Sequence, residues 1–147
     1  MTLGLVIQDE VTVDHAPTAA QFRLWLDTAL SFVADAPTQG ELTIRIISLD
    51  ESAQLNESYR QKQGPTNVLS FGYDTLDPFT GDLAICADLV QQEALAQEKL
   101  VEAHWAHLVV HGVLHLMGFD HIDDNEARDM EALETTIMQQ LKYTDPY

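Results

Sequence analysis

The stretch "AHWAHLVVHGVLHLMGFDH", residues 103–121, contains five of the six histidines of this 147-residue chain. Apolar residues recur through its first fifteen positions at helical spacing, which predicts a helix over 103–117. Gly118 follows, and a glycine at this position ends helices because it adopts a positive φ without strain. We therefore expect a central helix, a sharp turn and a short return segment.

Three of these histidines have spacing that suits one metal ion. His111 and His115 are four residues apart, so both imidazoles project from one helix face, about one turn apart. After the turn at Gly118, His121 can return beneath that pair. Three neutral imidazoles with an open fourth position are typical of a catalytic zinc site rather than a closed structural one. We predict one zinc ion at the end of the central helix, held by His111, His115 and His121.

Two other histidines lie on the same helix face. His107 precedes His111 by four residues and could pair with it in place of His115. We favour the set ending at His121, because it closes most easily after the glycine, and we interpret His107 as a buried, hydrogen-bonded neighbour of the ligands. His104 lies about 10 Å from His111 along the helix axis, too far to share its metal.

The histidine spacing also matches that of metzincin peptidases, H-E-x-x-H-x-x-G-x-x-H. The glutamate that acts as general base in those enzymes is replaced here by Gly112. A metal at this position can still polarise a substrate and activate water. The comparison therefore supports the metal, whereas a zinc hydrolase of metzincin type remains only an alternative.

Composition places limits on the class of protein. The length fits one domain, 1–147, and the single cysteine fits a reducing cytoplasm. No apolar run is long enough for a membrane span. Seven Lys and Arg stand against 24 Asp and Glu, a formal net charge of −17. Such a chain repels bare nucleic acid at long range, so any nucleic-acid function needs a local positive site or a basic partner protein.

The remaining elements follow from periodicity and turn residues. We expect Thr18 to cap a helix reaching about Phe32, and Asp50 to cap a helix ending near Arg60. The other predicted helices are Ala87 to about Glu98 and Asn125 to about Leu141. The predicted strands are Leu3–Gln8, 41–49, Val68–Phe71 and Asp82–Cys86, with a loop between the last two. Together they predict an α+β domain, in which a small mixed β-sheet packs against several α-helices.

Three segments carry a resemblance to a known family. "HWAHLVVHGVLHLMGFDH" (104–121), "YRQKQGPTNVLSF" (59–71) and "GDLAIC" (81–86) are similar to segments of the YbeY family, bacterial metal-dependent endoribonucleases also described as rRNA maturation factors. The resemblance extends from about Arg45 to Leu141. One departure is visible: this chain continues "LSF" with Gly72, where the family often has proline.

The resemblance implies a function and a set of partners. Members of the family cut single-stranded RNA, process the 3′ end of 16S ribosomal RNA and act in ribosome quality control. They are associated with the small ribosomal subunit, one of its ribosomal proteins and the GTPase Era. The resemblance also implies that His111, His115 and His121 bind the metal, usually taken as zinc, and that Arg60 is the functional arginine.

Two alternatives stay open at this point. The chain could be a ribosome-assembly binding factor whose metal is structural. Arg60 could equally be a surface arginine of the helix, paired with Glu57 or another acid, because exposed ion pairs are common. In the functional interpretation, Arg60 faces the metal cleft and stabilises charge that develops on a phosphate.

Overall fold

The computed structural model describes residues 3–12, 16–76, 78–119 and 123–147. Within these ranges the chain forms four strands and five helices, so the predicted α+β class is confirmed. The strands are β1 (Gly4–Asp9), β2 (Gly40–Ile47), β3 (Val68–Leu76) and β4 (Phe79–Cys86). The helices are α1 (Ala19–Ser31), α2 (Leu49–Arg60), α3 (Ala87–Ala96), α4 (Val101–Leu116) and α5 (Asp124–Gln140).

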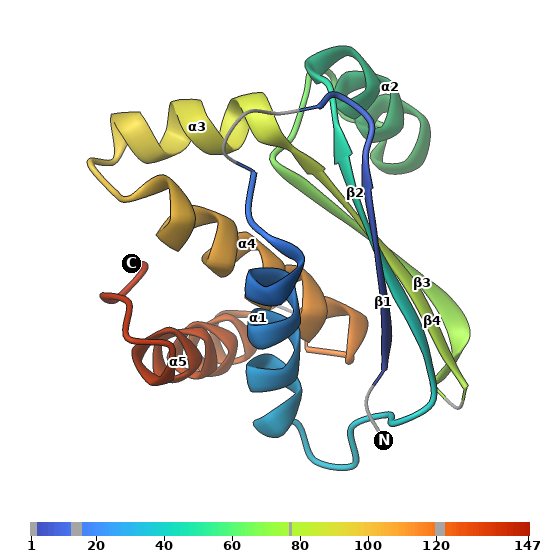
Figure 1. Ribbon diagram of the computed structural model, residues 1–147, viewed down its shortest axis with the longest axis vertical. Coiled ribbons are helices and arrows are strands. Elements are labelled where there is room, and N and C mark those ends of the chain that lie inside the picture. The colour runs from blue at the N-terminus through green and yellow to red at the C-terminus, as the bar shows by residue number, and fades with distance from the viewer. Residues whose placement is uncertain (1–2, 13–15, 77, 120–122) are drawn as a thin grey trace.

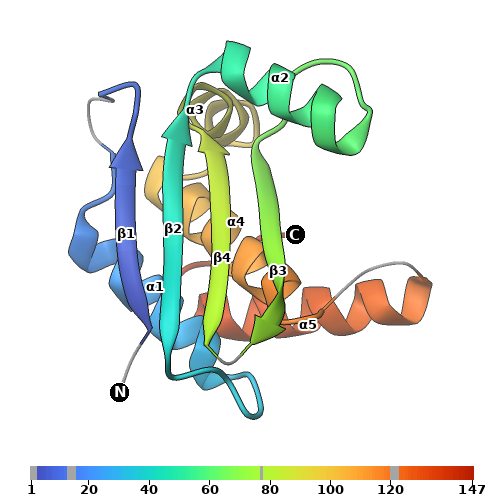
Figure 2. The ribbon, with the colours of Figure 1, turned by 90° about the vertical axis from the view of Figure 1, so that its right-hand side faces the viewer.

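The four strands form one mixed sheet in the order β1-β2-β4-β3. β1 and β4 both run parallel to β2, whereas β3 is antiparallel to β4 and lies at the edge. Figure 2 shows the sheet face on, with α1, α4 and α5 behind it. α2 lies beside the ends of the strands and is separated from those helices by the sheet (Figure 1).

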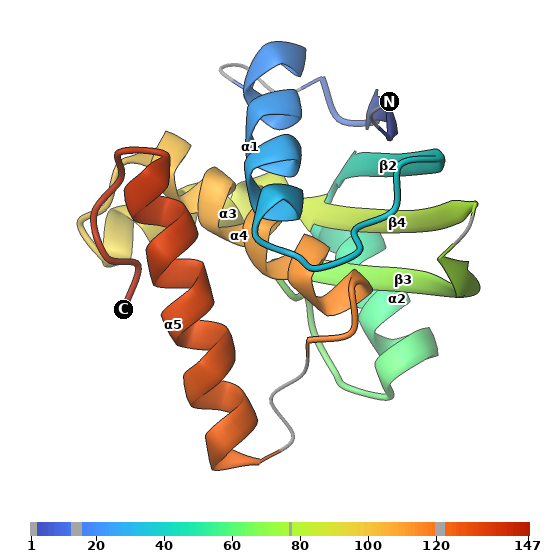
Figure 3. The same cartoon turned by 90° about the horizontal axis from the view of Figure 1, so that it is seen from below.

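The main core lies between the sheet and the helices that cover one face. α4 is the central helix of this layer, and it contacts β3, β4, α1, α3 and α5 (Figure 3). Its apolar residues, among them Val109, Val113 and Leu114, are almost completely buried. A smaller cluster, Ile47, Leu69, Ala84 and Cys86, packs toward α2 on the opposite face. None of the helices described here is both long and apolar enough to cross a lipid bilayer.

Gly112 lets α4 approach the sheet closely. A Cβ atom added at this glycine would lie 2.6 Å from Cδ2 of Leu83, a fully buried residue of β4. No side chain fits there without displacing the core. The absence of the metzincin glutamate therefore has a packing reason.

Two predicted helix boundaries are confirmed. Thr18 caps α1 through a reciprocal capping box with Gln21. Gly118 has φ +97°, the left-handed conformation expected of a helix-ending glycine.

Two other boundary predictions were wrong. The residue that caps α2 is Ser48, whose hydroxyl accepts a hydrogen bond from the Glu51 amide, so Asp50 lies in the first turn of the helix instead. The loop expected after Phe71 is mostly strand: Gly72 pairs with Gly81 across the β3–β4 hairpin. Both glycines therefore belong to paired strands rather than to a loop.

Candidate metal centre and catalytic cleft

Three histidines line one side of α4, as their four-residue spacing predicts. His107, His111 and His115 all face a cleft with a volume of about 1160 Å³. Nε2 of His111 lies 3.1 Å from Nε2 of His115, within hydrogen-bond distance, so the two ring nitrogens face each other. A tetrahedral zinc ion with Zn–N bonds of about 2.0–2.1 Å separates its nitrogen ligands by about 3.3–3.4 Å. The separation within the pair is therefore close to that of two nitrogens that share a zinc ion.

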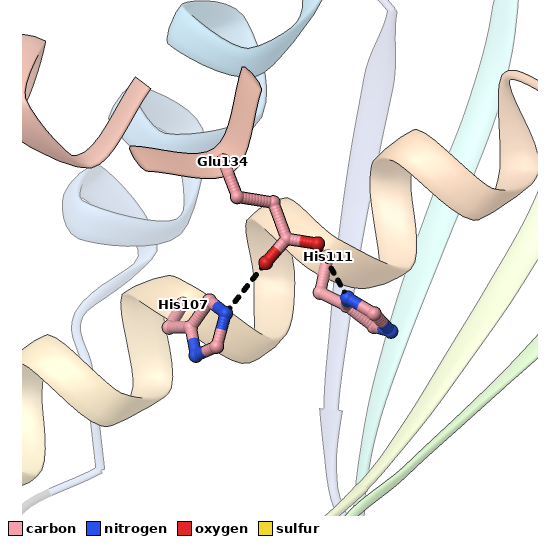
Figure 4. A group of neighbouring side chains, drawn as sticks. All are labelled: His107, His111 and Glu134. Atoms are coloured by element: carbon pink, nitrogen blue, oxygen red, sulfur yellow. Dashed lines mark hydrogen bonds and ion pairs between the residues drawn. The ribbon is translucent and has the colours of Figure 1, made fainter. Parts of the chain in front are cut away.

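A buried glutamate holds this histidine row from the other side. Glu134 of α5 is completely buried and reaches across to α4 (Figure 4). Its Oε2 lies 2.6 Å from Nε2 of His107, and its Oε1 lies 2.7 Å from Nδ1 of His111. With Nδ1–H of His111 donating to the carboxylate, Nε2 of the same ring is left to accept a metal.

Tyr147 supplies a third donor to Glu134. Its hydroxyl donates to Oε2 of Glu134 over 2.6 Å, and its ring packs edge-on against His107, with centroids 5.3 Å apart. Burial, and then the bond to the carboxylate, raise the pKa of Tyr147, so the phenol stays protonated as a donor.

These donors keep Glu134 ionised. Burial alone would raise the pKa of this carboxyl group, but the hydrogen bonds from His107, His111 and Tyr147 lower the pKa to about 2. A buried carboxylate needs such partners, because an unpaired charge in the interior is costly. The arrangement is a fixed negative charge that sets the orientation of two imidazoles.

Glu134 is not among the site residues that the sequence predicts. The apolar residues of the last predicted helix at helical spacing are Met130, Leu133, Ile137 and Leu141. Glu134 is nevertheless buried between Met130 and Met138, each four residues away on the same face. A single acid at a core position of an amphipathic helix is the signal that could have revealed it.

The structure brings together two overlapping groups that suit a metal. His107, His111 and Glu134 place ligand atoms within 4.8 Å of one another, and they form a possible metal site. The second group is the His111–His115 pair, which the sequence predicts together with His121. His121 and the neighbouring Asp120 lie outside the described residues. His111 belongs to both groups, so it is the centre of the site in either case.

His104 has a different partner from the other histidines of α4. It is buried, and its Nε2 lies 2.9 Å from Oε1 of Glu93 on α3, which also accepts a hydrogen bond from Asn67. Burial lowers the pKa of His104, so the ring tends to be neutral. It joins α4 to α3 rather than to the cleft.

Arg60 lines the cleft together with three histidines of α4. It is the last residue of α2, it is exposed, and it lines the same cleft as His111 and His115. Among the residues that the structure describes, Arg60 has no carboxylate partner, so the alternative pairing with Glu57 or another acid is not seen. Arg45, also at the cleft, is instead bound by Glu10 at 2.7 Å and by Glu51.

The fold and the site define a class: an α+β domain whose central helix presents histidines, backed by a buried carboxylate, to a cleft that also contains an arginine. Comparisons with known proteins are more specific. Residues 6–142 match the family "Endoribonuclease YbeY". A protein of Colwellia psychrerythraea named endoribonuclease YbeY is 50% identical, and the match covers 96% of this chain and 94% of that protein. The chain therefore belongs to the endoribonuclease YbeY family.

A solved structure supports the fold independently. The solution structure of TM1509 from Thermotoga maritima matches with a TM-score of 0.64 and 22% identity, covering 93% of this chain and 88% of the other. At this identity the likeness shows a shared fold.

Proposed function

We propose that this protein is a zinc-dependent endoribonuclease that cuts single-stranded RNA, acting in the cytoplasm in 3′-end maturation of 16S ribosomal RNA and in ribosome quality control. The observation that best supports this chemistry is that the Nε2 atoms of His111 and His115 lie 3.1 Å apart in a cleft that Arg60 also lines. Family membership supports the substrate, because the Colwellia relative is named an endoribonuclease.

The metal would be held by His111, His115 and His121. The donor set fits zinc, because neutral imidazoles are ligands that it prefers. When bound, such an ion polarises a phosphate oxygen and lowers the pKa of water. We favour this set over His107, His111 and Glu134, since the Glu134 carboxylate already accepts three hydrogen bonds from protein donors.

The residues of the chain have separate roles in this proposal. Glu134 holds the His111 ring in one tautomer and one orientation. Arg60 has no carboxylate partner among the described residues. It binds a phosphate of the RNA and stabilises the negative charge that develops during cleavage. A peptidase of metzincin type is disfavoured, because Leu83 occupies the space that a glutamate at position 112 would need.

RNA cleavage with and without a chelator tests this function. Purified protein is incubated with a single-stranded ribosomal RNA fragment, beside His115→Ala as a control. We expect the chelated protein and the variant to stay folded and to lose cleavage. If chelation instead unfolds the protein, the metal is structural, and an assembly factor is the better hypothesis.

Metal analysis of single variants tests the ligand set. We expect loss of the metal in His111→Ala, His115→Ala and His121→Ala, and retention in His107→Ala. Full loss on His107→Ala, with none on His115→Ala, would assign the metal to the group containing Glu134.

The net charge suggests one kind of partner, and the family resemblance suggests another. With a net charge of −17, the protein is repelled by naked RNA but attracted by a cationic protein surface. We propose that a basic protein of the small ribosomal subunit brings it to ribosomal RNA, with the GTPase Era, which the family resemblance implies, as a further partner. Binding to isolated small subunits should be tighter than to naked ribosomal RNA, and association should slow as salt rises. Equal binding to naked RNA would contradict recruitment by protein.

A further inference from the structure

An aromatic pair stands at the α2 side of the cleft. Tyr59 immediately precedes Arg60, and 68% of its surface is exposed. Its ring meets Phe71 of β3 edge to face, with centroids 5.1 Å apart and planes at 73°. Both residues line the cleft that contains His111 and His115. A solvent-exposed aromatic ring that packs against a second ring can stack with another planar group.

Charge alone cannot explain how the cleft would hold RNA. Binding by phosphate contacts requires several Lys or Arg side chains. Arg45 and Arg60 are the Lys and Arg side chains among the described residues that line the cleft, and Arg45 is neutralised by Glu10 and Glu51. Asp82 also lines the cleft. Much of the affinity must therefore come from contacts that do not depend on cations.

Stacking of nucleobases on aromatic rings is such a contact. Proteins that bind single strands combine a few cations with aromatic platforms, and every base offers a π-face. The cleft volume of about 1160 Å³ exceeds the range of about 300–1,000 Å³ for small-molecule sites, so it has room for more than one nucleotide.

We propose that Tyr59, supported by Phe71, is a subsite that stacks one unpaired nucleobase of the RNA substrate while Arg60 contacts the adjoining phosphate. The inference rests on the proposed function and deepens it, because it gives a physical reason for single-strand preference. A base inside a duplex has both faces covered by its neighbours and cannot reach the ring.

Steady-state kinetics of Tyr59→Ala and Tyr59→Phe on a single-stranded RNA provide the first test. Loss of one stacking contact, about 1–3 kcal/mol, corresponds to a rise in KM of roughly 5- to 150-fold. We expect this rise in Tyr59→Ala with a smaller change in kcat, and near wild-type behaviour in Tyr59→Phe, which keeps the ring. Leu95→Ala is the matched control, since Leu95 is 80% exposed but does not line the cleft.

Substrates that each lack one base make the test specific. If a base stacks on Tyr59, one abasic position should raise KM for the wild type but not for Tyr59→Ala, because the contact is already lost. A penalty of equal size in both proteins at every position would overturn the proposal, as would an unchanged KM in Tyr59→Ala.

A binding measurement separates this proposal from the proposed function. A cleavage-resistant 2′-O-methyl RNA carrying 2-aminopurine reports stacking as a change in fluorescence. We expect quenching with the wild type and with Tyr59→Phe, and none with Tyr59→Ala. Quenching without any cleavage of natural RNA would contradict the proposed nuclease function and support the stacking subsite. Cleavage of natural RNA with identical fluorescence in all three proteins would contradict the stacking subsite and support the nuclease function.

Discussion

Oε1 of Glu134 lies 2.7 Å from Nδ1 of His111, and this contact joins α5 to the histidine face of α4. The carboxylate is completely buried, so water does not weaken the interaction. A metal-binding histidine commonly has such a partner on its other ring nitrogen. The stability of the last helix and the orientation of the metal site therefore depend on the same side chain.

Glu134→Gln should weaken metal binding by about 10- to 100-fold, the usual effect of losing a carboxylate behind a histidine ligand. Competition with a chelator measures the affinity. Glu131→Gln, an exposed acid on the same helix, is the control and should bind metal like the wild type. An unchanged affinity in a folded Glu134→Gln protein would show that the carboxylate does not orient His111.

Tyr147→Phe should lower the free energy of unfolding by about 1 kcal/mol, because it removes a donor from a buried carboxylate. Tyr143→Phe is a matched comparison. The Tyr143 hydroxyl also donates to a carboxylate over 2.6 Å, but Glu102 is exposed and can turn to water. Urea unfolding of both variants should show the larger loss for Tyr147→Phe, and the reverse order would contradict the importance of burial.

Gly112→Ala should destabilise the protein by about 1–3 kcal/mol, the range for overpacking a core. In an ordinary helix interior, replacing Gly by Ala stabilises the protein by about 1 kcal/mol. The sign of the change in unfolding free energy therefore tells whether the core at Gly112 is overpacked. Gly72→Ala is the control, because its Cβ would meet only Leu116, at 3.5 Å. A Gly112→Ala protein more stable than the wild type would mean that Leu83 moves aside easily.

Stability should fall in mild acid because of His104. Burial lowers the pKa of His104 in the folded protein, whereas the unfolded chain binds its proton near the ordinary value of about 6.5. The unfolded state therefore binds more protons between the two pKa values. The contribution of His104 to the free energy of unfolding is fully present above about pH 6.5 and is lost as the pH falls toward the lowered pKa of the folded protein. Between pH 7 and 5, the unfolding free energy of His104→Gln should fall less than that of the wild type. If the unfolding free energies of both proteins depend on pH with the same slope, the loss of stability is not due to His104.

The parts of the fold that sequence could predict are those with local causes. The long apolar period of α4, the capping Thr18 and the positive φ at Gly118 depend on nearby residues, and all three are confirmed. Asp50 was a wrong cap because Ser48 offers an equivalent oxygen two residues earlier, and local chemistry does not rank the two.

The candidate site was predictable only in part for a related reason. Residues His111 and His115 share one helix, so their proximity follows from spacing. Glu134 and Tyr147 reach the site through tertiary packing, and no periodicity within α4 points to them. The metal ligand predicted at His121 lies outside the described residues and stays a prediction.

The position of β4 between β2 and β3 has a consequence for folding. The β3–β4 hairpin joins neighbouring segments of chain, whereas the parallel pairing of β4 with β2 closes a much longer loop. Local pairings form faster than distant ones, so the hairpin should precede its docking on β2. Arg60 comes before this hairpin in the chain and His111 comes after it. A chain still emerging from the ribosome would therefore have no assembled cleft until α4 has been synthesised and the parallel pairing has closed.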